Sequence, residues 1–287
     1  MQVKPLDSSA PIHRSFFNSE RVDLIKQVAK KTLIEAVVLG AIVGITSAFV
    51  LPGMVYIMIV ATAIVLTINV LVRLGIAELT YRQRHNPTEA KKNIIKALNW
   101  VAPCSFSVVA SGTMGTVIHE TGHKVAAELF YKNPNPRITV IPFKGGFTQY
   151  TLRGFSNLGA KLGFTTTDIL TTAAGSIAAV GVSTGLLIAG FATETSHPEL
   201  SKYFIVSAII SIAEHIFYAL SALWTSPVQV GHDFVALSLY GISPVACAIS
   251  MGTIPLVVKG LFALGSLVNS YVIHPSKHNN VAHLQAV

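Results

Sequence analysis

The chain has 287 residues, of which 51% are hydrophobic and only 12% are charged, and its mean hydropathy is +0.58. Soluble domains carry about twice that share of charged residues, so the composition excludes an ordinary soluble protein and indicates a protein of the lipid bilayer. The net charge of +8 comes from Lys and Arg residues that fall mainly between the apolar runs. This placement is typical of membrane orientation and contact with anionic lipids, and argues against nucleic-acid binding.

The N-terminal third begins with a polar tail, residues 1–31, for which we predict an amphipathic helix near residues 20–31. Two apolar runs follow, residues 32–51 and 54–74, and each has about the 20 residues that a membrane span needs. Because only Pro52-Gly53 separates them, we expect a helical hairpin.

A charged stretch with helix-forming character, residues 73–96, ends this part of the chain. Together with the hairpin it forms a predicted unit over residues 32–96. The predicted membrane core then follows, residues 97–240, and a C-terminal membrane region with its tail occupies residues 241–287.

The predicted core contains three apolar runs, near residues 97–131, 167–192 and 203–224. Between the first two lies PRITVIPFKGGFTQYTLRGF, residues 136–155. Its strand-forming residues surround Lys144-Gly145-Gly146, so we predict a β-hairpin there.

The last apolar region, residues 234–273, is too long for one span, and Pro244, Gly252 and Pro255 are the places where it could divide in two. We therefore predict an all-α polytopic membrane protein with about six to seven transmembrane helices and a small membrane-associated β-hairpin. Lys and Arg are dense in several connecting segments, and these segments cannot all lie on the cytoplasmic face if every apolar run crosses the membrane once. Either the third apolar region breaks at Pro103 or an early segment is re-entrant.

The stretch VIHETGHKVAAEL, residues 117–129, places three polar, metal-competent side chains in an apolar surrounding. His119 and His123 are four residues apart, so on a helix both imidazoles reach one metal ion, because they lie only about 40° apart around its axis. Glu120 lies about 100° from His119, near enough to accept a proton from a water on the metal. This HExxH pattern predicts a zinc site with Glu120 as general base.

The alternative interpretation of the motif is ordinary polarity where a span meets water. Placing an unpaired carboxylate such as that of Glu120 in lipid costs several kcal/mol. This cost favours a functional role of the motif over ordinary polarity. Three glycines support a close approach of another backbone: Gly112 and Gly115 lie on the side of the helix that carries His119, and Gly122 lies within the motif.

A third zinc ligand must come from another segment, and WTSPVQVGHDFVAL, residues 224–237, is the best source. We favour Asp233, because an anionic ligand offsets the charge of the ion in a low-dielectric site, while His232 stays open. The pair Glu214-His215 lies within a span, where we expect it deeper in the membrane than the end of the third apolar run. It is either a polar pair facing the bundle interior or a support for the site.

At this point the sequence resembles the site-2 protease family of intramembrane zinc metalloproteases, over roughly residues 105–240. The HExxH on a membrane helix is one match, and the order of segments is another. AAGSIAAVG, residues 173–181, is similar to the Gly-Pro-x-x-Asn element of the family, with Ser176 and Ala179 in place of Pro and Asn. WTSPVQVGHDF is similar to Asn-x-x-Pro followed by Leu-Asp-Gly, with Trp224 and Phe234 as replacements and one extra residue before Asp233.

The resemblance implies an enzyme that binds Zn²⁺ through His119, His123 and Asp233. It also implies that the enzyme cuts transmembrane protein substrates in the lipid bilayer, and that the hairpin pairs with the substrate. The sequence gives no sign of an oligomeric state.

A different class of function is a polytopic divalent-metal transporter, and a further alternative is a catalytically inactive protease homologue. A transporter is expected to supply a second metal-binding helix rich in His, Asp and Glu, and this chain offers only Glu214-His215. The hairpin has no role in transport. Both points favour the protease.

Overall fold

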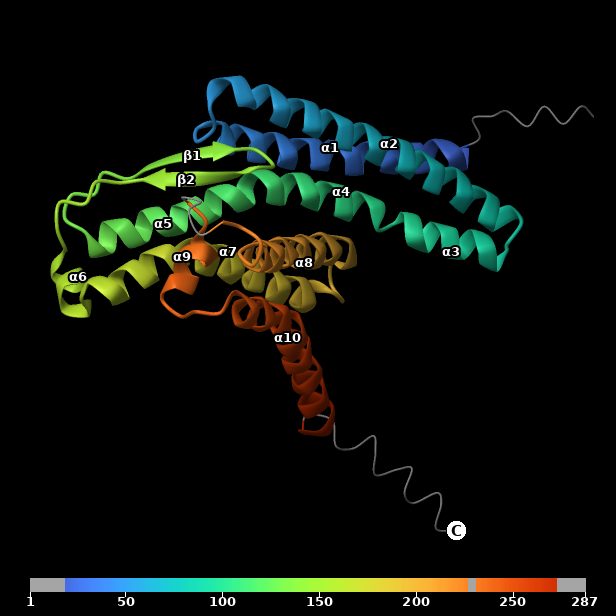
Figure 1. Ribbon diagram of the computed structural model, residues 1–287. Coiled ribbons are helices and arrows are strands. Elements are labelled where there is room, and N and C mark those ends of the chain that lie inside the picture. The colour runs from blue at the N-terminus through green and yellow to red at the C-terminus, as the bar shows by residue number, and fades with distance from the viewer. Residues whose placement is uncertain (1–18, 227–230, 273–287) are drawn as a thin grey trace, which may run out of the picture.

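The computed structural model describes residues 19–226 and 231–272 and shows an all-α membrane fold with one two-stranded sheet (Figure 1). The predicted tails fall largely on residues 1–18 and 273–287, which lie outside the described residues. Within these described residues, five helical segments are long and apolar enough to cross a bilayer: Pro52–His85, Glu89–Phe130, Phe164–Thr193, Pro198–Ser221 and Pro244–Asn269.

The N-terminal helices, α1 (Ser19–Ser47) and α2 (Val55–His85), form the expected hairpin, joined through a short 3₁₀ turn at Pro52–Met54. α1 runs unbroken through residue 31, so the predicted amphipathic segment and the first apolar run are one helix. α1 is not among the five candidate spans, since its apolar half is short, contains Glu35 and directly follows Lys30 and Lys31. This helix and the short α9 account for the difference from the six to seven spans expected.

A buried polar network joins this hairpin to the rest of the bundle. The Glu35 carboxylate of α1 lies 2.6 Å from the Arg73 guanidinium of α2 and accepts a hydrogen bond from Asn69 at 3.2 Å. Arg73 also donates to the hydroxyl of Tyr203 on α8 at 2.9 Å, and that hydroxyl contacts Glu35. Because an unpaired charge in lipid is costly, these contacts fix α1 and α2 against each other and against α8.

The next segments, α3 (Glu89–Leu98), α4 (Val101–Ala110), a π-helical turn (Ser111–Gly115) and α5 (Thr116–Phe130), follow one another almost without interruption. The only interruption lies at residues 99–100, so the break considered at Pro103 is wrong. Pro103 is the third residue of α4, and at a helix N-terminus the missing N–H of proline costs little, because that group has no partner within the helix.

The β-hairpin is confirmed, with β1 (Arg137–Ile141) and β2 (Gly145–Gln149) antiparallel and Val140 opposite Gly146. Its turn rests on the π-helical segment, where the Phe143 N–H donates to the Gly112 carbonyl at 2.9 Å. Figure 1 shows the hairpin lying along α5.

The C-terminal half contains α6 (Asn157–Leu162), α7 (Phe164–Thr193), α8 (Pro198–Ser221), α9 (Asp233–Leu239) and α10 (Pro244–Val272). Its core is the α7–α8 contact, against which Phe234 of α9 packs. Of the predicted division points only Pro244 separates two helices, because Gly252 and Pro255 lie inside α10.

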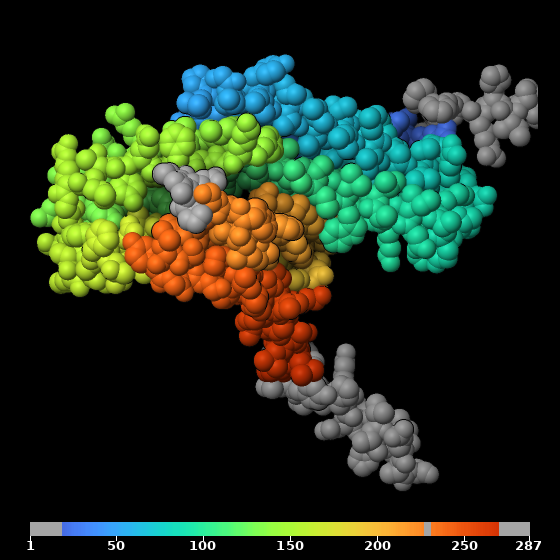
Figure 2. Space-filling model, in the orientation of Figure 1, coloured from blue at the N-terminus to red at the C-terminus, as the bar shows by residue number. Residues whose placement is uncertain are grey.

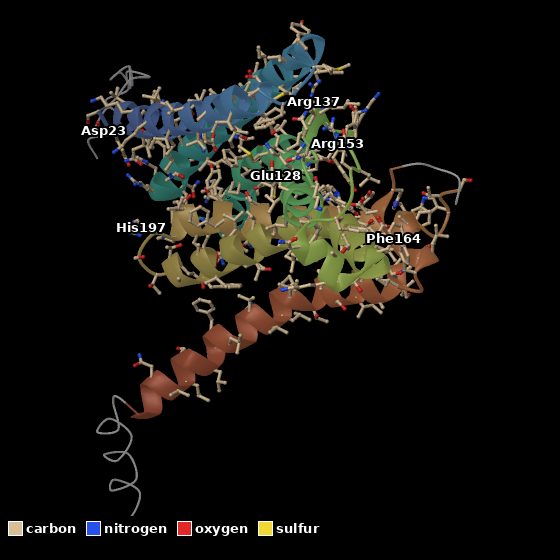
Figure 3. The ribbon with its side chains drawn as sticks, turned by 90° about the vertical axis from the view of Figure 1, so that its left-hand side faces the viewer. Asp23, Glu128, Arg137, Arg153, Phe164 and His197 are labelled. Atoms are coloured by element: carbon tan, nitrogen blue, oxygen red, sulfur yellow. The ribbon has the colours of Figure 1, made fainter. Side chains whose placement is uncertain are left out.

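Two ends of the bundle are distinguished in Figure 3, where α10 slants away from the other helices. Arg137, Arg153 and Phe164 lie at the end that carries the hairpin and α6. Asp23 and His197 lie at the opposite end.

The network between α1, α2 and α8 makes a stability prediction. E35A leaves Arg73 buried without its anion, and we expect a loss of unfolding free energy on the order of 3 kcal/mol. The double variant E35L/R73M removes both charges and should recover most of it. Unfolding in detergent measures the unfolding free energy of both variants. A loss below about 1 kcal/mol in E35A would contradict the prediction.

Candidate metal centre

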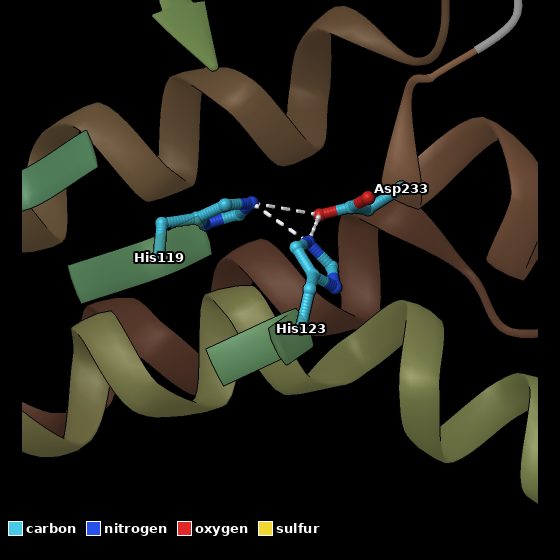
Figure 4. Close-up of side chains that lie close together, drawn as sticks. All are labelled: His119, His123 and Asp233. Atoms are coloured by element: carbon cyan, nitrogen blue, oxygen red, sulfur yellow. Dashed lines mark hydrogen bonds and ion pairs between the residues drawn. The ribbon is translucent and has the colours of Figure 1, made fainter. Parts of the chain in front are cut away.

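Two histidines of α5 and one carboxylate of α9 meet inside the bundle (Figure 4). The Nε2 atoms of His119 and His123 are 3.2 Å apart. Oδ2 of Asp233 lies 3.0 Å from the first and 3.2 Å from the second. Ligand atoms about 2.05 Å from a tetrahedral zinc ion are about 3.4 Å from one another, so the three side chains fit a metal ion with three protein ligands.

The start of α9 places Asp233 in this cluster. Gly231, with a φ of +92°, turns the chain, and the N–H of Asp233 then donates to the Tyr218 hydroxyl at 3.0 Å. Burial alone would raise the pKa of the Asp233 carboxyl, but its hydrogen bonds and charge interactions with His119 and His123 lower the pKa to about 2. The carboxylate is therefore anionic at neutral pH, as a metal ligand must be.

His232, the other candidate for the third ligand, points elsewhere. Its Nδ1 faces the N–H of Val235 at 3.4 Å, and its Nε2 lies 2.8 Å from the Ser221 hydroxyl. Burial lowers the pKa of His232, so the ring is neutral at pH 7. With both ring nitrogens engaged, His232 is not part of the cluster.

α7 passes close beneath the two imidazoles. A Cβ atom on Gly175 would lie 2.4 Å from Nε2 of His123 and 2.6 Å from Nε2 of His119. One on Gly122 would lie 2.3 Å from the Ala174 carbonyl oxygen, so the close backbone approach predicted for Gly122 is confirmed. The glycines of both helices thus place the α7 backbone directly against the site.

The other two predicted glycines behave differently from each other. A Cβ on Gly112 would meet the ring of Phe143 at 2.4 Å, so the hairpin turn is the segment that approaches there. Gly115 meets no second backbone, and it borders the cavity beside the cluster instead.

Glu120 is buried beneath β2. The Thr148 hydroxyl donates to Oε2 of Glu120 at 2.8 Å and lies 3.0 Å from the main-chain oxygen of the same residue. A Cβ on Gly146 would lie 2.8 Å from Cγ of Glu120. The strand therefore covers the carboxylate and holds it by one side-chain hydrogen bond.

A cavity of about 550 Å³ lies between α5, the hairpin, α8 and the start of α9. Figure 2 shows the molecule hollowed on this side, between the hairpin and α9. The polar side chains on its wall include His119, Glu120, Glu214, His215 and Tyr218.

The edge of β2 away from β1 is open. The N–H of Val140 in β1 donates to the Phe49 carbonyl at 2.9 Å, so Val140 turns its main-chain groups away from β2. Because this direction alternates along a strand, Gly146 and Thr148 of β2 also turn their main-chain groups away from β1. Among the described residues no strand pairs with that edge.

Sequence reasoning missed four contacts that shape the site. Thr148 contacts Glu120, and Tyr218 contacts Asp233. The Thr171 carbonyl contacts His123, and His215 contacts His119. Alternation along β2 predicts that Gly146 and Thr148 share one face of the strand. It does not predict which helix that face covers. A supporting role of His215 at the site was one of the two expected alternatives, and its Nε2 lies 3.4 Å from Nδ1 of His119. Glu214 lines the cavity, where it accepts a hydrogen bond from Ser111.

Comparison of the chain with protein-family models, with curated proteins and with solved structures finds no match. The likeness to site-2 proteases therefore remains one of motifs and segment order.

Proposed function

We propose that the protein is an intramembrane zinc metalloprotease that hydrolyses peptide bonds of membrane-spanning proteins. One observation supports this most: His119 of the cluster with His123 and Asp233, the general-base candidate Glu120 and Gly146 at the open edge of β2 all line a single cavity. Two imidazoles and one carboxylate form a donor set typical of catalytic zinc, whereas magnesium and calcium prefer oxygen ligands.

Glu120 acts as the general base of the proposed reaction. A zinc ion held by His119, His123 and Asp233 would act as a Lewis acid and lower the pKa of the attacking water. Glu120 accepts the proton of that water and passes it to the leaving amine. The hydrogen bond from Thr148 fixes one carboxylate oxygen, Oε2, and so holds the carboxylate in one orientation on the wall of the cavity.

The open strand edge answers a second requirement of proteolysis in lipid. A helical peptide bond is shielded, and an unwound segment needs partners for its main-chain groups. The outward N–H and C=O groups of Gly146 and Thr148 supply such partners by strand addition. Because both residues lie over Glu120, a substrate paired there runs past the general base.

The transporter alternative requires a second site along a path through the membrane. In the described part of the chain the cluster of His119, His123 and Asp233 is the one group of three side chains placed to hold a metal ion. This supports hydrolysis over transport. Metal analysis of the purified protein, together with cleavage of co-expressed single-span proteins, separates the two functions.

The first prediction concerns the general base. E120Q should lower cleavage by about 10²–10⁴-fold and leave bound zinc unchanged, since glutamine keeps the Thr148 contact but cannot take up the proton. E128Q is the matched control, because Glu128 lies on the same helix, half-exposed and paired with Lys124. Undiminished turnover by E120Q would refute the mechanism.

The second prediction concerns the third ligand. D233A should lose most of its zinc, and H232A should retain it, because only Asp233 reaches the imidazoles. Zinc per protein, measured on purified variants, is the readout. Zinc lost from H232A but kept by D233A would assign the ligand to His232 instead.

The third prediction concerns the strand edge. T148V and T148P both lose the hydroxyl that contacts Glu120, but only T148P also loses the outward N–H. If that N–H binds substrate, T148P should cleave more slowly than T148V at equal zinc content. Equal rates, or a parallel loss of zinc in T148P, would show that the edge has only a structural role.

A further inference from the structure

His215 of α8 lies behind the cluster, on the side of His119 that faces away from Asp233. Its Nε2 is 3.4 Å from Nδ1 of His119, and its own Nδ1 is 2.9 Å from the main-chain carbonyl of Ser211. The side chain is buried, at 8% exposure. Both of its ring nitrogens therefore have a definite partner.

These partners determine where the ring protons lie. A carbonyl oxygen only accepts, so Nδ1 of His215 must carry the hydrogen. In the neutral ring Nε2 then presents a lone pair, and its partner, Nδ1 of His119, must be the donor. The remaining nitrogen of His119, Nε2, is left with a lone pair directed toward Asp233 and His123.

His123 reaches the same state by a shorter route. Its Nδ1 donates directly to the Thr171 carbonyl of α7 at 2.8 Å, which leaves Nε2 free on the side of the cluster. α7 packs directly on α5, so its carbonyl is within reach. On the α8 side the carbonyl of Ser211 is one imidazole further away, and the ring of His215 spans that gap.

We propose that His215 is a positioning residue of the metal centre: it holds His119 in the tautomer with the hydrogen on Nδ1, so that Nε2 is free to bind the ion. The proposal rests on the zinc site of the proposed function. His215 is not a ligand, because its Nε2 faces the wrong nitrogen of His119. A hydrogen-bond partner of this kind typically changes metal affinity by about 10–100-fold.

The test compares variants of the full-length protein by competition for zinc against a chelator. H215L removes the acceptor, and we expect zinc affinity to fall by about 10–100-fold. H215Q places an amide oxygen where Nε2 lies, so it should bind zinc nearly as the wild type does. S211A is the matched control, since it keeps the carbonyl that His215 needs and should not change the affinity.

A second readout follows the proton itself. In spectra of ¹⁵N-histidine-labelled, zinc-loaded protein, His119 should show a protonated Nδ1 in the wild type and in H215Q. The Nδ1 proton should exchange faster with water in H215L. Thermal unfolding without zinc checks the fold of each variant, and H215M replaces H215L if the latter does not fold.

The outcomes separate this proposal from the zinc site itself. A wild-type protein without zinc affinity would refute the proposed function, and the role of His215 with it. Zinc affinity in the wild type together with equal affinity in H215L would overturn the role of His215 alone. An H215Q variant as weak as H215L would also overturn it, because the loss would then reflect ring packing and not an acceptor.

Discussion

The close contact between α5 and α7 is the constraint on which the rest of the site depends. Gly122 lets the α7 backbone touch α5, and Gly175 lets it pass beneath both imidazoles without a side chain between them. This approach brings the Thr171 carbonyl to His123 and leaves His119 and His123 facing Asp233. A bulky residue at either glycine would push the two helices apart and so disrupt the site even with His119, His123 and Asp233 unchanged.

Polar contacts inside the bundle follow one face of α8. Tyr203, Ser207, Ser211 and His215 are each four residues apart, so they lie in one row along the helix. Their side chains contact Glu35, Ser107, Ser183 and His119 respectively. This row connects the Glu35–Arg73 network with the candidate metal centre, and its polar groups find their partners within the protein, as the lipid phase requires.

The local sequence pattern predicted much of this structure, whereas the contacts between distant segments are known only from the structure. The apolar runs, the hairpin around Gly145 and the spacing of His119 and His123 are local, and the helices and strands follow them. The contact of Thr148 with Glu120 joins segments that no local period relates. Pro103 misled for a different reason: its effect depends on its position in the helix, and that position was set by a turn at residues 99–100.

The two edges of the hairpin are not equivalent. The hydrogen bond between Val140 and Phe49 occupies the middle of the β1 edge, so no further strand can run along that side. Only one strand at a time can pair directly with the open edge of β2. Under the proposed function, two extended peptides would therefore compete for that edge. The same blocked edge keeps the hairpins of neighbouring molecules from stacking into a continuous ladder.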